Sequence, residues 1–268
     1  MNRTAPPAFF DLVGHPLRWQ LLVELARSDR RVDELVDRIG EPQALVSYHL
    51  ARLRAGNLVS SRRSSFDGRA VYYHARLESC GAALAATGPF LHPGLGLQRV
   101  PLPDAGLAAR RPRVRVLFAC TGNSARSQIA EALLKQSAGP AVHVVSAGSA
   151  PKPVHPHAVA VLAERGIDIS TWRSKRLTEF AGEHFDYVVT LCDKVRERCP
   201  QIDDAGEAVH WSIGDPTDTA DGARVTLPRF RRLADEIEDR ITWLTWVIDG
   251  RHSTTHPTRQ STTKEFTT

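Results

Sequence analysis

The chain has 268 residues, with 35 Lys or Arg and 30 Asp or Glu, and this length predicts two domains. No apolar run approaches the ~18 residues that a membrane-spanning helix needs. The first ten residues also lack the basic-then-apolar pattern of a signal peptide. These features argue against a membrane or secreted protein, and we expect a cytoplasmic location.

The net charge of +5 is unevenly distributed along the chain. Residues 1–113 contain 16 Arg, no Lys and ten acids, a net charge of +6, whereas residues 114–268 carry −1. A basic N-terminal part favours a polyanionic partner, although the excess of Arg over Lys would also follow from a GC-rich genome. Because cytosolic thiols stay reduced, the cysteines are expected to be catalytic, redox-active or metal-binding; they are Cys80, Cys120, Cys192 and Cys199.

The first part of the sequence predicts helices followed by a hairpin. Apolar residues recur at helical spacing over 17–25 and 32–39, and after a turn at Gly40 and Pro42 a third helix is expected over 43–55. Strand-like residues 58–61 and 70–74 flank an Asp-Gly turn signal, and a helix is expected over 77–86. Residues 87–113 are rich in Gly and Pro and predict a linker.

The second part alternates strands and helices. Strands are expected at 114–119, 142–147, 187–191 and 208–211, and helices at 127–135, 156–165 and 227–248. Such alternation predicts an α/β domain with a four-stranded parallel sheet covered by helices. We therefore expect domains at 1–86 and 114–250, a linker at 87–113 and a polar, disordered tail at 251–268.

A helix, a turn, a second helix and a basic hairpin are typical of a winged helix-turn-helix that binds DNA. If Val46, Leu50 and Leu53 face the core, the opposite face carries side chains that reach bases and phosphates: Gln43, Ser47, Tyr48 and Arg52, with His49 and Arg54 at its margin. The wing adds Arg62, Arg63 and Arg69. The alternative is a small helical interaction module whose arginines are simply solvated.

The stretch from His15-Pro16-Leu17-Arg18 through Val46-Ser47-Tyr48-His49-Leu50-Ala51-Arg52-Leu53 to Gly56-Asn57-Leu58-Val59 resembles the arsenic-responsive repressor (ArsR) family over residues 8–86. The resemblance implies a homodimer on a palindromic operator. The Cys-x-Cys metalloid site of many members is missing here, because residues 31–39 contain no cysteine. Cys80 is a weak substitute, since a dimer would offer two thiols where trivalent arsenic prefers three, and the inducer stays unassigned.

Cys120 begins a Cys-x5-Arg loop that ends at Arg126, directly after a predicted strand and before a predicted helix. Such a loop wraps its backbone N–H groups around a tetrahedral oxyanion, and Arg binds two of its oxygens. The expected substrate-binding residues are Thr121, Gly122, Asn123, Ser124, Ala125 and Arg126. The same positive potential favours the Cys120 thiolate as nucleophile, Ser127 is placed to donate to its sulfur, and Asp215 is the candidate general acid.

With Ser146-Ala147-Gly148-Ser149, Gly166–Ser170, Val189–Asp193, Cys199-Pro200 and Asp215-Pro216, this loop resembles the low-molecular-weight tyrosine phosphatase superfamily, and within it the thioredoxin-coupled arsenate reductases. The resemblance implies a thiol relay. Cys120 attacks arsenate and water leaves through Asp215; Cys192 then attacks Cys120 and releases arsenite, and Cys199 attacks Cys192. Basic residues near these thiols would favour thiolates: Lys194, Arg196 and Arg198.

The relay implies arsenate as substrate, no tightly bound cofactor and an external thiol reductant, thioredoxin or mycothiol with mycoredoxin. No metal site is expected, because neither a Cys-x2-Cys pair nor clustered histidines accompany the cysteines. One alternative is a phosphatase, which needs only Cys120, Arg126 and Asp215, but Thr217-Asp218-Thr219 stand where such enzymes usually carry aromatic residues. The other is a DNA-binding regulator whose Cys120 pocket senses an oxyanion or redox state with little turnover.

Overall fold

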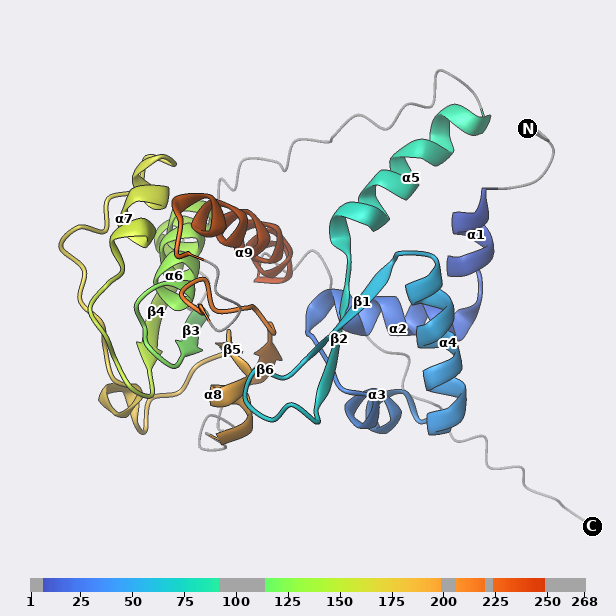
Figure 1. The fold of residues 1–268 in the computed structure, drawn as a ribbon, viewed down its shortest axis with the longest axis horizontal. Coiled ribbons are helices and arrows are strands. Elements are labelled where there is room, and N and C mark those ends of the chain that lie inside the picture. The colour runs from blue at the N-terminus through green and yellow to red at the C-terminus, as the bar shows by residue number, and fades with distance from the viewer. Residues whose placement is uncertain (1–6, 92–113, 199–205, 220–223, 249–268) are drawn as a thin grey trace, which may run out of the picture.

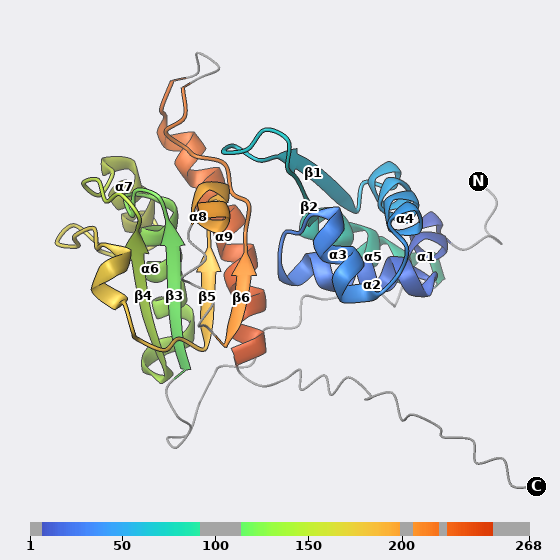
Figure 2. The same ribbon diagram turned by 90° about the horizontal axis from the view of Figure 1, so that it is seen from below.

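The computed structural model describes residues 7–91, 114–198, 206–219 and 224–248. Within these ranges the chain forms a helical N-terminal domain and an α/β C-terminal domain that lie side by side (Figure 1 and Figure 2). Most of the expected linker, the expected tail and Cys199 fall outside the described residues. Among the described helices none is both long and apolar enough to cross a membrane.

The N-terminal domain is a bundle of short helices with a two-stranded wing. Its elements are α1 (Ala8–Val13), α2 (Pro16–Arg27), α3 (Val32–Ile39), α4 (Gln43–Ala55), β1 (Val59–Arg63), β2 (Val71–Ala75) and α5 (Leu77–Leu91). Leu21, Leu35 and Leu50 are almost fully buried at its centre, as their helical spacing predicts. Helix α5 continues past residue 86 into the segment expected to be linker.

The C-terminal domain has the predicted parallel sheet, with strand order β4-β3-β5-β6. Its elements are β3 (Val114–Cys120), α6 (Arg126–Ala138), η2 (Gly139–Ala141), β4 (Val142–Gly148), α7 (Pro156–Ala163), η3 (Leu177–Phe180), β5 (Tyr187–Thr190), α8 (Asp193–Arg198), β6 (Glu207–His210) and α9 (Leu227–Ile248). The main core lies between the sheet and helices α6, α7 and α9, and a smaller one lies against η3. Both sheet faces are therefore covered, which explains the almost continuous apolar sequence of β3.

The two domains are joined through the segment between α2 and α3. The Asp29 backbone N–H donates to the His210 carbonyl at the end of β6 (2.7 Å), and Arg30 pairs with Tyr73 of β2 as an antiparallel bridge. This segment of the N-terminal domain thus contacts both its own wing and the edge strand β6 of the C-terminal domain. The wing itself extends toward α8 and β6 (Figure 1).

Candidate active site and DNA-binding surface

The Cys120 loop lies at the carboxyl end of the central strand β3, where ligands bind in open parallel sheets. Arg126 is the first residue of α6, so the intervening loop sits on the positive end of that helix. Asn123 adopts a left-handed φ of 43°, which Asn tolerates better than most residues. Its side-chain Nδ2 donates to Ser146 Oγ (2.7 Å), and its Oδ1 accepts from the Lys175 backbone N–H (2.7 Å). These contacts hold Asn123, and with it the loop, in place.

The Cys120 sulfur is surrounded by hydrogen-bond donors. The Asn123 backbone N–H points to Sγ at 3.2 Å, and Ser127 Oγ lies 3.0 Å from it. Ser127 also accepts from Asn123 Nδ2 (2.9 Å), which orients its own hydroxyl toward the sulfur. Both groups are thus placed to hydrogen-bond the sulfur that would attack an electrophile.

Arg126 is held across the loop by the segment that follows β6. Its Nη1 donates to the Ile213 carbonyl (2.9 Å) and its Nη2 to Asp215 Oδ2 (2.7 Å). Burial alone would raise the pKa of Asp215, but the Arg126 guanidinium and the hydrogen bonds from Thr217 hold it below its ordinary value. Asp215 is thus a carboxylate paired with the arginine that would bind substrate.

Gly148 is the last residue of β4, and the structure shows why this position requires a glycine. A Cβ at this position would lie 2.7 Å from the Thr121 carbonyl and 2.9 Å from the Asn123 backbone nitrogen. Only a glycine lets β4 approach the Cys120 loop so closely, because both neighbours are backbone atoms that the loop geometry fixes.

Cys192 follows β5 and lies against the Cys120 loop, where Thr121 Oγ1 is 3.4 Å from its sulfur. Burial raises the pKa of the Cys192 thiol, an effect that Arg126 and Thr121 offset only in part. The expectation that neighbouring basic residues favour a Cys192 thiolate is therefore wrong for this arrangement. Arg196 instead pairs with Glu34 of α3 (2.8 Å), and Arg198 lies over the Phe66 ring.

Glu131 of α6 supports the Cys120 loop through Ser146. It is 2% exposed and accepts from Ser146 Oγ (2.6 Å), which in turn holds Asn123. The ammonium groups of Lys135 (2.5 Å) and Lys175 (3.1 Å) balance its charge. Across the described ranges no group of three or more His, Cys, Asp and Glu is placed to hold a metal ion.

The polar face that the sequence predicts on α4 is exposed. Val46, Leu50 and Leu53 are buried, and four polar residues are exposed on the other side of the helix: Gln43, Ser47, Tyr48 and Arg52. Tyr48 is 57% exposed, although its ring meets that of His49 edge to face at 5.1 Å. The surface has the composition that base and phosphate contacts require.

His49 does not belong to this face. The prediction that it contacts DNA is wrong, because its side chain is buried. The side chain is 4% exposed and its ring lies 4.3 Å from that of His15. Its Nδ1 is 3.5 Å from Arg18 Nη1. His49 precedes Leu50 on the side of α4 that packs against α2, so it joins two helices.

The wing arginines are divided between solvent and the second domain. Arg63 and Arg69 are exposed, as expected for residues that approach DNA phosphates. Arg62 is turned the other way, with its Nη2 3.1 Å from Asp193 Oδ2 in α8. Arg62 is partly exposed, but its guanidinium contacts the second domain. The hairpin sequence could not indicate this contact.

A nucleophilic cysteine at the end of a parallel strand, with an anion-binding loop, an arginine and a carboxylate, defines an enzyme that handles tetrahedral oxyanions. Residues 115–253 match the low molecular weight phosphotyrosine protein phosphatase family, and residues 15–61 match the bacterial regulatory protein, arsR family. The chain therefore belongs to the low molecular weight phosphotyrosine protein phosphatase family.

Curated relatives match the second domain. An arsenate reductase of Halalkalibacterium halodurans is 40% identical over 126 residues, which cover 47% of this chain and 91% of the relative. An arsenate reductase of Bacillus subtilis is 36% identical over the same length, with the same coverage. Among solved structures, a thioredoxin-dependent arsenate reductase of Corynebacterium glutamicum is 33% identical, covers 53% of this chain and 64% of its own, and gives a TM-score of 0.42.

Proposed function

We propose that the C-terminal domain reduces arsenate to arsenite and that Cys120 is its nucleophile. The observation that carries this proposal is the second thiol, Cys192, which lies against the anion loop with Thr121 Oγ1 3.4 Å from its sulfur. Hydrolysis of a phosphoester needs one cysteine, whereas reduction of arsenic(V) needs two electrons from thiols. The curated relatives that match this domain are named arsenate reductases, which supports the same choice.

Arsenate would bind on the backbone N–H groups of residues 121–126, with two of its oxygens on the Arg126 guanidinium. Arg126 then shares its charge between Asp215 and the anion. Because the bound oxyanion adds a negative neighbour, we expect the pKa of Asp215 to rise on binding. A proton brought by the protonated oxyanion can then be held on the Asp215 carboxyl and passed to the departing water.

The relay conserves atoms and electrons. The Cys120 thiolate forms a sulfur–arsenic bond and one oxygen leaves as water, with a proton from Asp215. Cys192 attacks the Cys120 sulfur, so that a disulfide forms and the electron pair of the sulfur–arsenic bond stays on arsenic, now arsenic(III). Cys199 attacks the Cys192 sulfur, which frees Cys120 as a thiolate. An external dithiol, from thioredoxin or mycoredoxin with mycothiol, reduces the resulting disulfide.

Arsenate-dependent oxidation of NADPH, with thioredoxin and its reductase, tests the relay. Turnover should be lost in Cys120→Ser, Cys192→Ser and Cys199→Ser, and Cys80→Ser serves as the control because this thiol lies in the other domain. A protein that hydrolyses p-nitrophenyl phosphate in the Cys192→Ser and Cys199→Ser forms, and never reduces arsenate, would be a phosphatase. The same assay with mycothiol and mycoredoxin distinguishes the two reductants.

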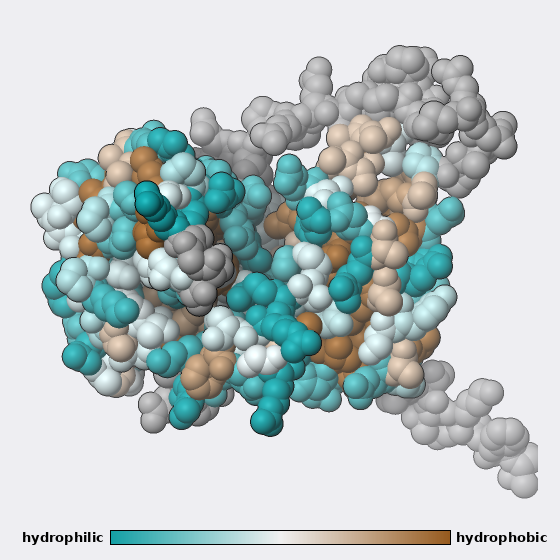
Figure 3. Space-filling view, viewed as in Figure 1, coloured by the Kyte–Doolittle hydropathy of each residue, from teal (hydrophilic) through white to brown (hydrophobic). Residues whose placement is uncertain are grey.

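We also propose that the N-terminal domain binds operator DNA as a homodimer. The exposed polar face of α4 supports DNA contact. Self-association is supported by large apolar side chains that are exposed on α1, α2 and α5: Phe10, Trp19 and Leu84 are 42%, 57% and 47% exposed. Hydrophobic residues are visible over α5 in Figure 3.

Binding to the DNA upstream of its own coding sequence tests this proposal, with mass determined by light scattering. Arg52→Ala should weaken binding and lower the slope of log affinity against log salt by about 1, the value for one lost phosphate contact. Arg232→Ala, an exposed arginine of α9 in the other domain, is the matched control. Equal affinity of the two variants would contradict the assignment of α4 as the helix that contacts DNA.

A further inference from the structure

The tip of the wing is docked on α8, the helix that begins immediately after Cys192. Arg62 Nη2 lies 3.2 and 3.1 Å from the two carboxylate oxygens of Asp193, and the backbone N–H (2.8 Å) and Oγ (2.9 Å) of Ser65 both donate to Asp193 Oδ2. One turn further along α8, Glu197 Oε1 accepts from Ser64 Oγ (2.8 Å) and from the Tyr72 hydroxyl (3.2 Å). The wing therefore binds two carboxylates of the other domain.

Asp193 is a fully buried carboxylate whose partners come from both domains. From its own domain Ser212 Oγ donates to Oδ1 at 2.6 Å, and His210 Nε2 lies 3.3 Å from the same oxygen. Burial alone would raise its pKa, but these hydrogen bonds, with those from Ser65 and the charge of Arg62, hold the pKa of Asp193 well below its ordinary value. Asp193 is thus an anion whose second oxygen is bound by the wing.

The groups that bind these carboxylates are those that a wing uses on DNA: a guanidinium, a backbone N–H and hydroxyls. A carboxylate and a phosphate oxygen accept from the same donors, so one wing cannot satisfy both. We propose that Asp193 and Glu197 occupy the phosphate-binding groups of the wing, and that docking of the wing on α8 and its contact with DNA exclude each other. This inference rests on the proposed DNA binding of the N-terminal domain.

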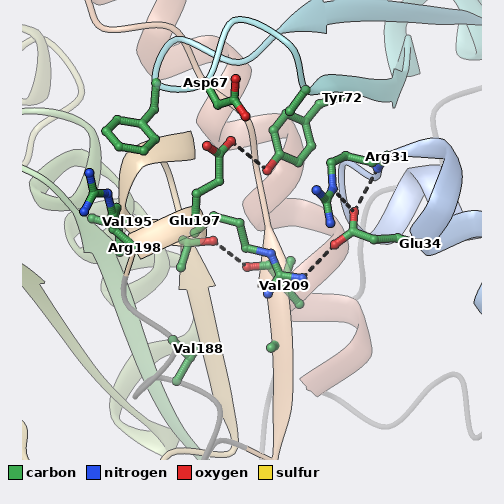
Figure 4. A pocket seen from close by; sticks show the side chains of 14 residues that line it. Arg31, Glu34, Asp67, Tyr72, Val188, Val195, Glu197, Arg198 and Val209 are labelled. Atoms are coloured by element: carbon green, nitrogen blue, oxygen red, sulfur yellow. Dashed lines mark hydrogen bonds and ion pairs between the residues drawn. The ribbon is translucent and has the colours of Figure 1, made fainter.

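The docked surface is polar and incompletely packed, so its separation should be reversible. A cavity of about 560 Å³ lies beside the contact, between the wing and α3 on one side and α8 and β6 on the other. Figure 4 shows the contact between Glu197 and Tyr72 that spans the two sides. Arg196 of α8 also donates to Glu34 of α3 at 2.8 Å. Polar contacts next to open space give little of the dispersion energy that fixes a closely packed interface.

Docking also links DNA to the thiol relay, because Asp193 is the residue after Cys192 and α8 spans the interval up to Cys199. If DNA removes Arg62 and Ser65 from Asp193, the start of α8 loses four hydrogen bonds to the wing. Because docking and DNA binding exclude each other, any change that stabilises the docked wing lowers the affinity for DNA. By thermodynamic linkage, bound DNA favours the undocked wing by the same free energy.

The test uses Glu197→Gln and Asp193→Asn in the full chain, because both residues lie outside the DNA-binding domain. Glu164→Gln, directly after α7, is the matched control, since it removes one negative charge from a glutamate that pairs with Arg231 instead of the wing. We expect affinity for the DNA upstream of the coding sequence to increase about fivefold for Glu197→Gln, which weakens two hydrogen bonds to an ionised group, and less than twofold for the control. Hydrogen exchange without DNA should show the Ser65 amide exchanging faster in Asp193→Asn than in the unaltered protein.

Equal DNA affinity of Glu197→Gln, Asp193→Asn and Glu164→Gln would overturn the competition while leaving DNA binding intact. A Ser65 amide that exchanges equally fast in the unaltered protein and in Asp193→Asn would show that the wing is not docked. If no form of the protein binds the DNA, the proposed DNA binding fails and the competition fails with it. The arsenate reductase assay is independent of all three results.

Discussion

Arg126 has two partners that compete for its charge, the Asp215 carboxylate and the expected oxyanion. Its guanidinium already donates from Nη1 to a backbone carbonyl and from Nη2 to Asp215, so its plane is fixed before substrate binds. A lysine would keep the charge but lose the fork that binds two oxygens at once. Oxyanion binding at position 126 therefore depends on the geometry of the side chain as much as on its charge.

We predict that Arg126→Lys lowers kcat/KM for arsenate by about a hundredfold or more, in line with the loss of a preorganised donor to a developing charge. Steady-state turnover with excess reductant measures the effect. Arg173→Lys is the matched control, because Arg173 is 71% exposed and pairs only with Glu179 and a neighbouring carbonyl. A fall of less than threefold in Arg126→Lys would contradict the bidentate role.

Asp215 should give the reaction its dependence on pH. Its pKa lies below the ordinary value in the free protein, so the proton that it donates must arrive with the oxyanion. As pH rises, less protonated arsenate is present and kcat/KM should fall. Asp215→Asn should lower kcat by about 10²–10⁴, the usual contribution of a general acid, and flatten the profile of kcat against pH. An unchanged profile in Asp215→Asn would assign the proton to another group.

The residues of the Cys120 site could be predicted from the sequence because they are close together in the chain and each has a distinctive chemistry. Cys120, Arg126 and Ser127 share one loop, and the structure brings Asp215 to Arg126 as expected. The burial of His49 and the contact of Arg62 with Asp193 could not be predicted, for one reason. His49 contacts His15 and Arg18, and Arg62 contacts Asp193. Because these partners are distant in sequence, neither the helix period nor the hairpin pattern indicates them.

At the scale of elements, the end of β4 and the Cys120 loop form one closely packed unit. Gly148→Ala should destabilise the C-terminal domain by about 1–3 kcal/mol, because the new Cβ would displace the Thr121 carbonyl and the Asn123 nitrogen. Arsenate affinity should fall as well, since these atoms shape the anion site. Thermal unfolding and anion titration measure the two effects.

Gly81→Ala in α5 provides the matched control, because a Cβ there has nothing within 4 Å. In a helix this change should leave stability unchanged or slightly increased. If both substitutions have the same effect on the anion titration, the close approach of β4 does not shape the loop.

Elements with a strong hydrophobic period could be predicted, and short polar ones could not. Helix α4 has its predicted bounds, and the four strands of the large sheet are within a residue or two of expectation. Helix α8 was not predicted, since six residues with a single buried apolar side chain, Val195, show no period. So short a helix is not stable alone, and its contacts with the wing and with α3 supply what its sequence lacks.

At the scale of the whole molecule, the two domains share a buried ion pair that is independent of the wing. Asp29, between α2 and α3, is 1% exposed, and Arg240 of α9 donates to its Oδ1 at 2.9 Å. The Ser212 backbone N–H donates to the other oxygen of Asp29 at 2.6 Å. The pKa of Arg240 is raised: burial alone would lower it, but the charges of Asp29 and Glu236 outweigh that effect. This pair therefore fixes the N-terminal domain to β6 and α9.

We predict that Arg240→Gln separates the domains without unfolding either. Removing one partner of a buried pair leaves an uncompensated charge, at a cost of about 3–5 kcal/mol if Asp29 stays in place. Each domain has its own hydrophobic core, so the interface should open and hydrate Asp29 instead. Small-angle scattering should show a larger radius of gyration, and thermal unfolding should change from one transition to two.

Arg232→Gln is the matched control, because Arg232 lies on the exposed side of the same helix and its loss changes the net charge equally. It should leave both the radius of gyration and the single transition unchanged. The opened Arg240→Gln protein should also bind DNA more tightly than the control, since its wing loses the second domain as a support for docking on α8. A protein that stays compact and unfolds in one step in the Arg240→Gln form would show that backbone contacts such as Asp29 N–H to His210 suffice to hold the domains together.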